Sequence, residues 1–130
     1  MKRHPERYGK TRSFEDVWLW QQAPFPVRSI YDDLLTQKDF GFRDQIQRAS
    51  ISIMNNIAEG YERQTDKEFL RFLYVARSSC AEVRSMLYLA DEFNYATREC
   101  IGQMHDTATE IAKLLSGLIK YLKDYPARVK

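Results

Sequence analysis

A wide hydrophobic pattern lies between Phe42 and Glu59. Its apolar positions share one face of a helix, and neighbouring apolar residues widen that face to an arc of about 200°. The face consists of Phe42, Ile46, Ala49, Ile53 and Ile57, with Ile51, Met54 and Ala58 on its flank. A single packing partner needs an arc of only about 100°. We therefore predict a helix that is buried on two sides and ends near Glu59.

A narrow polar strip follows the same segment at helical spacing. It consists of Arg48, Ser52, Asn55 and Glu59. Asn is a poor residue for a helix interior, so we expect at least one of Asn55, Asn56 and Glu59 to be buried and bonded to another helix or subunit. Glu59 lies at the negative end of the helix dipole. Two interpretations stay open for it: an exposed pair with Arg63, or a contact between helices or subunits.

The residues after this segment have the pattern of a helix end followed by a helix start. Gly60 is predicted to be the residue after the helix, in a left-handed conformation. Thr65 and Glu68 have the spacing of a capping box, so the next helix should run from Asp66 to about Phe93. Its apolar stripe is Phe69, Phe72, Leu73, Ala76, Cys80, Val83, Leu87 and Ala90.

A turn at Asn94 and an N-cap at Thr97 should precede the last helix. Its stripe has the cleanest periodicity in the chain: Ile101, Met104, Ala108, Ile111, Ala112, Leu115, Leu118, Ile119 and Leu122. Such a stripe is typical of core packing.

A further helix is predicted before the loop at residues 36–41. Ser13 is its expected N-cap, and one face carries Phe14, Val17, Trp18 and Gln21. Pro24 and Pro26 should break this helix, because each lacks an amide hydrogen and disfavours the α conformation in the residue before it. We predict an all-α fold: an up-down-up-down antiparallel four-helix bundle over residues 13–122, with the first helix broken near Pro24–Pro26.

Several blocks carry a resemblance to a known family: Gln45–Gly60, Arg63, Glu68–Phe69, Arg71–Leu73 and Ala76–Ser78. From about Phe14 to Leu122 the chain resembles the four-helix-bundle proteins of the ribosomal-RNA intervening-sequence family, which are small bacterial proteins. Asn55–Gly60 is the most specific block. This family usually has an unbroken first helix, so the two prolines are a departure.

The resemblance extends in fold to the accessory variability determinant of diversity-generating retroelements. That protein forms a ring-shaped pentamer and binds nucleic acid and a reverse transcriptase. The resemblance thus implies a homo-oligomer, expected to be a pentamer. It implies no biochemical activity.

Charge is distributed unevenly along the 130 residues. Residues 1–12 hold five Lys or Arg and one Glu, and residues 123–130 hold three Lys or Arg and one Asp, so these ends carry +4 and +2. The whole chain carries +2, which leaves −4 for residues 13–122. We therefore interpret residues 1–12 as a flexible basic arm and residues 123–130 as a basic tail. The body is not that of a strongly basic nucleic-acid-binding protein.

Motifs for catalysis or metal binding are not found in the sequence. The two histidines are His4 and His105, and Gly102 stands three residues before His105, so the Glu-x-x-His pattern of di-iron bundles is absent. No phosphate-binding loop or nucleophile elbow occurs. We expect no enzyme activity, no cofactor and no metal. The chain lacks a signal peptide or membrane-spanning run, so a cytoplasmic location is expected, with Cys80 and Cys100 as reduced thiols.

Two functions remain open. The first is an oligomeric accessory protein that binds RNA or DNA. Its expected contacts are the arm residues Lys2, Arg3, Arg7, Lys10 and Arg12, then the tail residues Lys123, Arg128 and Lys130, or else body arginines gathered by assembly: Arg48, Arg63, Arg71, Arg77 and Arg84. Arg77 and Arg84 are better explained as long side chains that cover the edge of the core than as an anion site. The second function is a scaffold that binds protein partners and no nucleic acid.

Overall fold

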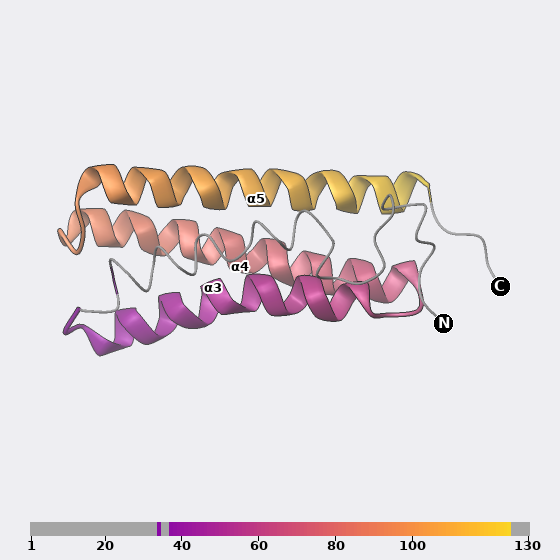
Figure 1. The fold of residues 1–130 in the computed structure, drawn as a ribbon, viewed down its shortest axis with the longest axis horizontal. Helices are drawn as coiled ribbons and strands as arrows, with labels where there is room; N and C mark the ends of the chain where they lie inside the picture. Colours follow the sequence, from indigo (N-terminus) through magenta and orange to yellow (C-terminus); the bar gives the residue numbers. More distant parts are fainter. Residues whose placement is uncertain (1–33, 35–36, 126–130) are drawn as a thin grey trace.

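Three long helices form the part of the chain that the structure describes. The computed structural model describes Leu34 and residues 37–125, and this part contains α3 (Phe40–Tyr61), α4 (Asp66–Glu92) and α5 (Arg98–Asp124) and no strand (Figure 1). The all-α prediction is confirmed there. The predicted first helix, its break at Pro24–Pro26 and the basic arm lie outside the described residues. A complete four-helix bundle therefore stays a prediction.

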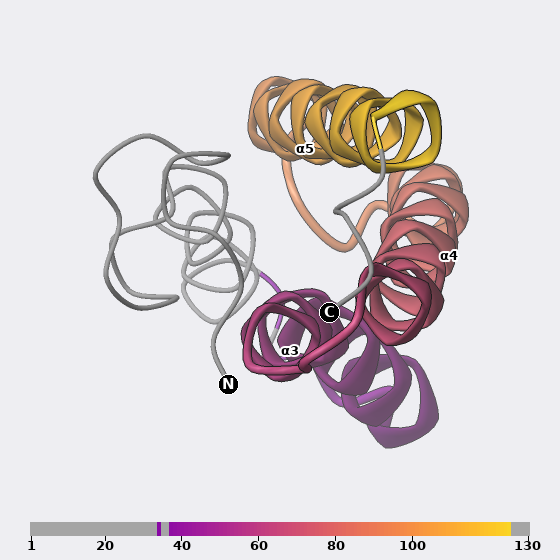
Figure 2. The same cartoon turned by 90° about the vertical axis from the view of Figure 1, so that its right-hand side faces the viewer.

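The central helix of this part is α4. Helix α4 runs antiparallel to α3, and α5 runs antiparallel to α4 (Figure 1). When the helices are viewed end-on, α4 lies between α3 and α5 (Figure 2). Both α3 and α5 contact α4, whereas no Cα atom of α3 comes within 8 Å of a Cα atom of α5. The face of α4 opposite these contacts is therefore its outer surface.

The start of α3 is tied to the loop after α4. Asp39 is the N-cap, and its Oδ1 accepts a hydrogen bond of 3.1 Å from the amide of Phe42. Its Oδ2 accepts the hydroxyl of Tyr95 at 2.6 Å, and the side chain of Gln37 donates to the carbonyl of Tyr95 at 2.8 Å. The helix thus begins within the loop predicted for residues 36–41, because Asp39 supplies the oxygen that an exposed helix start requires.

Gly60 does not have the predicted left-handed conformation. It lies inside α3, which continues to Tyr61 and is capped by Glu62, and it is buried. A Cβ atom built on Gly60 would lie 2.8 Å from Cβ of Phe72 and 2.9 Å from Cδ1 of Phe69. The glycine is therefore required by the close approach of α3 and α4, and not by the backbone conformation.

The predicted starts of α4 and α5 are confirmed. The hydroxyl of Thr65 accepts the amide of Glu68 at 3.2 Å and donates to the Glu68 carboxylate at 3.1 Å. The hydroxyl of Thr97 accepts the amide of Cys100 at 3.1 Å. Asn94, in the turn between the helices, has a φ of 57°, a conformation that Asn tolerates better than most residues.

The core consists of the predicted stripes, with few exceptions. The main face of α3 is buried, whereas its flank at Ile51, Met54 and Ala58 is only half-buried. Phe72 is the half-buried member of the α4 stripe, and Ala112 and Leu118 are the half-buried members of the α5 stripe. Leu34, before α3, is fully buried. None of the helices in the described ranges is both long enough and apolar enough to cross a membrane.

Candidate nucleic-acid interface

A short polar chain joins α3 to α4. Nδ2 of Asn56 donates to the carbonyl and to the hydroxyl of Ser52, at 2.8 and 2.9 Å, and the hydroxyl of buried Ser79 donates to the Ser52 hydroxyl at 2.8 Å. The hydrogen bonds of half-buried Asn56 thus stay within its own helix, one turn back, and reach α4 only through Ser52. Asn55 and Glu59 are exposed. Contacts of these residues with another subunit stay a prediction.

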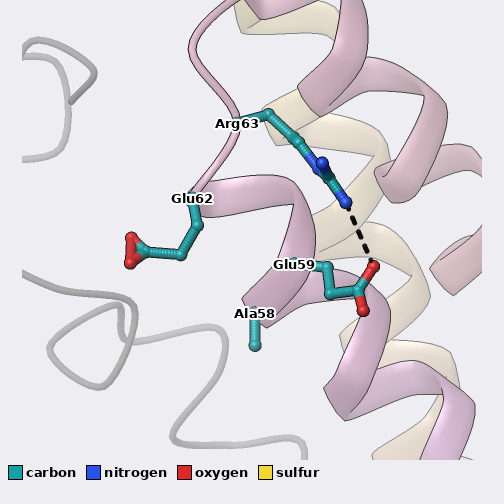
Figure 3. A pocket seen from close by; sticks show the side chains of 4 residues that line it. All are labelled: Ala58, Glu59, Glu62 and Arg63. Carbon is teal, nitrogen blue, oxygen red and sulfur yellow. Dashed lines mark hydrogen bonds and ion pairs between the residues drawn. The ribbon is translucent and has the colours of Figure 1, made fainter. Parts of the chain in front are cut away.

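The end of α3 carries an open depression of about 390 Å³, lined by Ala58, Glu59, Glu62 and Arg63. Nη2 of Arg63 lies 3.4 Å from Oε2 of Glu59, and Figure 3 shows Glu62 pointing away from this pair. The Arg63 guanidinium also lies over the ring of Phe72, 4.6 Å from its centroid. The depression holds two carboxylates and one arginine that already pairs with Glu59, so it is a poor site for phosphate.

Basic side chains gather between α4 and α5 near the C-terminal end of α5. The groove there has a volume of about 260 Å³ and is lined by Tyr74 and Arg77 of α4 and by Ser116, Ile119, Lys120, Lys123 and Asp124 of α5. We call it the α4–α5 basic groove. It holds three cationic side chains and one carboxylate.

Hydrogen bonds and stacking order the two sides of this groove. Nη1 of Arg77 donates to the hydroxyl of Ser116 at 3.2 Å, and its guanidinium lies 5.2 Å from the centroid of the Tyr74 ring. Nζ of Lys120 donates to Asp124 at 2.6 Å, and this hydrogen bond raises the pKa of Lys120. Because α5 continues to Asp124, Lys123 lies on the helix, one turn after Lys120. A fixed guanidinium, two ammonium groups and an aromatic ring suit a phosphate backbone.

The other predicted arginines are scattered. Arg48 and Arg71 are exposed on different helices, and Arg84 is half-buried, with an Nε atom that is buried and has no hydrogen-bond partner. Lys2, Arg3, Arg7, Lys10, Arg12, Arg128 and Lys130 lie outside the described residues. Of the predicted cations, the fold brings together Arg77 and Lys123. Lys120 was not among the predicted contacts, although its spacing of three residues from Lys123 places both on one face of a helix.

A third hollow, of about 270 Å³, lies at the opposite end of α5 and includes Tyr88, Asp91, Arg98 and His105. Burial lowers the pKa of His105, whose Nε2 is buried without a hydrogen-bond partner. The His105 ring packs edge-on against Tyr88, with centroids 4.5 Å apart. Within the described ranges, no three His, Cys, Asp or Glu side chains are grouped to hold a metal ion.

The two cysteines are free thiols in different surroundings. Cys80 is fully buried, and burial raises its pKa to about 12. Cys100 is half-buried. A thiol that stays protonated at neutral pH is a weak nucleophile, so Cys80 serves packing.

Comparisons with known proteins place these features in a family. The family model described as 23S rRNA-intervening sequence protein matches residues 15–117. Among solved structures, the chain is similar to a protein of unknown function from the S23 ribosomal protein family of Bacteroides thetaiotaomicron VPI-5482. The identity is 32%, the TM-score is 0.73, and the match covers 78% of this chain and 98% of that chain. A comparison with curated proteins finds no match. The family resemblance predicted from Gln45–Ser78 is confirmed, and the relation to retroelement accessory proteins stays a prediction.

Proposed function

We propose that this chain, which belongs to the family of 23S rRNA-intervening sequence proteins, is a cytoplasmic, non-enzymatic accessory protein that assembles with itself and binds nucleic acid. The observation that carries the proposal is the α4–α5 basic groove. Arg77, Lys120 and Lys123 supply positive charge there, whereas residues 13–122, which include the first two, carry a net charge of −4. Assembly would repeat this groove, and the basic arms would add further contacts.

The groove is suited to the backbone of a nucleic acid and not to reading its sequence. Its cations can each contact a phosphate, and the ring of Tyr74 offers a surface on which a base can stack. Asp124 offsets part of the charge, so we expect modest affinity that depends strongly on salt. On duplex DNA each phosphate contact contributes a slope of about 0.9 in the logarithm of affinity against the logarithm of salt concentration.

The groove is tested by titrating labelled single-stranded RNA and duplex DNA with the protein, at salt concentrations from about 50 to 200 mM. The test variant replaces Arg77, Lys120 and Lys123 with Gln. The matched control replaces Lys67, Arg98 and Lys113 with Gln, which removes the same charge from exposed positions outside the groove. We expect only the test variant to bind the nucleic acid more weakly and to show a smaller dependence of affinity on salt. Equal losses in the two variants would contradict a defined groove.

The basic arm is tested separately by deleting residues 1–12 and repeating the titration after circular dichroism and mass measurements show intact folding and assembly. If Lys2, Arg3, Arg7, Lys10 and Arg12 contact phosphates, the affinity and the salt slope should both fall. An unchanged salt slope would leave the groove and the body arginines as the whole binding surface.

The second candidate function is a scaffold for protein partners. It is favoured by the −4 charge of residues 13–122 and by the exposed residues of α4 between Arg71 and Glu92, none of which is charged. Absence of any nucleic-acid binding at low salt, in a protein that still assembles, would support the scaffold and refute the accessory role.

A further inference from the structure

Two tyrosines lie at the C-terminal end of α5. Tyr121 is in the last turn and Tyr125 caps the helix, and their rings are 5.4 Å apart with an angle of 37° between them. Tyr121 is 38% exposed and Tyr125 is 66% exposed. We call these two residues the tyrosine pair. An exposed aromatic ring is a surface on which a nucleic-acid base can stack, and stacking tolerates any base.

The tyrosine pair and the α4–α5 basic groove lie on opposite flanks of α5. At about 100° per residue, Tyr121 is about 160° around the helix from Lys123, which lines the groove, and about 100° from Lys120. Gly117 and Asp124 lie between Lys120 and Tyr121 on this exposed side of α5. A Cβ atom on Gly117 would meet nothing within 4 Å. A bound strand can therefore cross α5 close to its backbone at Gly117.

Positive charge follows the same path around α5. Lys123 lies at the groove, Lys120 lies at the crossing, and Arg128 and Lys130 come soon after the tyrosine pair in the sequence. Asp124 is the one acidic residue in residues 120–130, and it accepts a hydrogen bond from Lys120 at 2.6 Å. The C-terminal end of a helix has a negative potential, so a phosphate needs such cations in order to bind there.

The aromatic rings favour a single strand over a duplex. In a duplex the faces of the bases are already stacked on one another, whereas the unstacked bases of a single strand can lie against tyrosine rings. Tyr74 offers such a ring in the groove, beside the Arg77 guanidinium. A helix with its side chains is roughly 10–12 Å wide, so a strand of a few nucleotides can reach from Tyr74 to the tyrosine pair. Rings on both sides of a cationic crossing form a continuous surface for such a strand.

We propose that the α4–α5 basic groove binds single-stranded nucleic acid, which continues across α5 at Gly117 onto the tyrosine pair. One base stacks on Tyr74, phosphates contact the cations of the groove and of the crossing, and a later base stacks on the tyrosine pair. The inference rests on the proposed function and deepens it, because it assigns a ligand class to the groove and adds a second binding surface. Stacking and phosphate contacts do not involve the 2′-hydroxyl, so RNA and DNA strands are expected to bind alike.

The stacking surfaces are tested with Tyr74→Leu and Tyr125→Leu, which each remove a ring and no charge. Each variant should bind a labelled single strand of about ten nucleotides at least about fivefold more weakly, with the same salt slope as the native protein. Binding to a duplex of that length should not change. Tyr74→Phe and Tyr125→Phe keep the rings and should bind as the native protein does. Tyr88→Leu is the matched control, since it removes a 71% exposed ring from the hollow at the opposite end of α5.

Each comparison is made with an RNA strand and a DNA strand of one sequence, after circular dichroism shows that the variants are folded. Leucine variants that bind both strands as the native protein does would overturn the inference, and so would equal affinity of the native protein for single strand and duplex. In either case, loss of binding in the variant with Gln at Arg77, Lys120 and Lys123 would still support the groove as a phosphate site. Absence of binding to every nucleic acid would overturn both the proposed function and this inference.

The crossing is tested at Gly117. Gly117→Glu places a carboxylate there and should weaken single-strand binding severalfold, because phosphates must pass close to it. Gln103→Glu adds the same charge at an exposed position of α5, about 14 residues earlier or roughly 21 Å along the helix, which exceeds the screening length at about 0.1 M salt. Equal affinities of these two variants for the single strand would overturn the path across α5.

Discussion

The glycine at the contact between α3 and α4 offers the sharpest test of the fold. Gly60→Ala adds one methyl group, and its carbon atom would lie 2.8 Å from Cβ of Phe72 and 2.9 Å from Cδ1 of Phe69. The Phe69 ring can rotate slightly. Cβ of Phe72 is attached directly to the backbone and can yield only if α4 moves. Restoring ordinary contact requires the helices to separate by about 0.6 Å, which weakens packing along this end of the interface.

Two opposing effects decide how much Gly60→Ala changes the free energy of unfolding. Alanine is a better helix residue than glycine by about 1 kcal/mol, with a smaller gain in the last turn, where Gly60 lies. Overpacking a well-packed contact costs about 1–3 kcal/mol. The steric cost should exceed the gain, so we expect Gly60→Ala to lower the free energy of unfolding by about 1–2 kcal/mol. For a chain of this length that corresponds to a fall in Tm of about 3–8 °C.

The assay is urea or thermal unfolding followed by circular dichroism, with all proteins at one concentration because assembly adds to apparent stability. Gly117→Ala is the matched control. Gly117 is an exposed glycine inside α5, and a Cβ atom there would meet nothing within 4 Å. The free energy of unfolding of this control should rise by about 0.5–1 kcal/mol from helix propensity alone. A Gly60→Ala protein that is stabilised as much as the control would refute the steric explanation.

Five further results are expected. Thr65→Ala should lower the free energy of unfolding by about 1 kcal/mol through loss of the α4 N-cap, as measured by urea unfolding. In the same assay Asn56→Ala should lower the free energy of unfolding by somewhat less than one hydrogen bond contributes, because alanine favours the helix. In the native protein a thiol reagent should modify Cys100 and spare Cys80 until urea is added. The free energy of unfolding should also fall above pH 9. At that pH the Cys80 thiol ionises in the unfolded chain but not in the folded protein, where its pKa is raised to about 12. The lowered pKa of His105 means that the unfolded chain binds a proton more readily, so stability should fall as the pH drops below 6.5, and His105→Gln should reduce that dependence.

Local sequence is enough to predict most of the helix boundaries and apolar faces in the described part. The helix starts at Thr65 and Thr97, the turn at Asn94 and the apolar stripes of α4 and α5 follow from side-chain chemistry that acts within a few residues. Asp39 is also a residue type that favours the N-cap, although it lies within the loop predicted for residues 36–41. Such signals are short in range, so the order of residues is enough to reveal them.

Contacts between residues far apart in the sequence depend on how the helices pack. Gly60 looked like a helix terminator because a glycine after a long stripe is common at helix ends, and the approach of Phe72 from another helix cannot be seen from neighbouring residues. The α4–α5 basic groove joins Arg77 to Lys120 and Lys123, which lie more than forty residues further along the chain. Their cooperation depends on the antiparallel packing of α4 and α5. Charge clusters formed across helices are therefore set by packing geometry, whereas caps and stripes are set by local sequence.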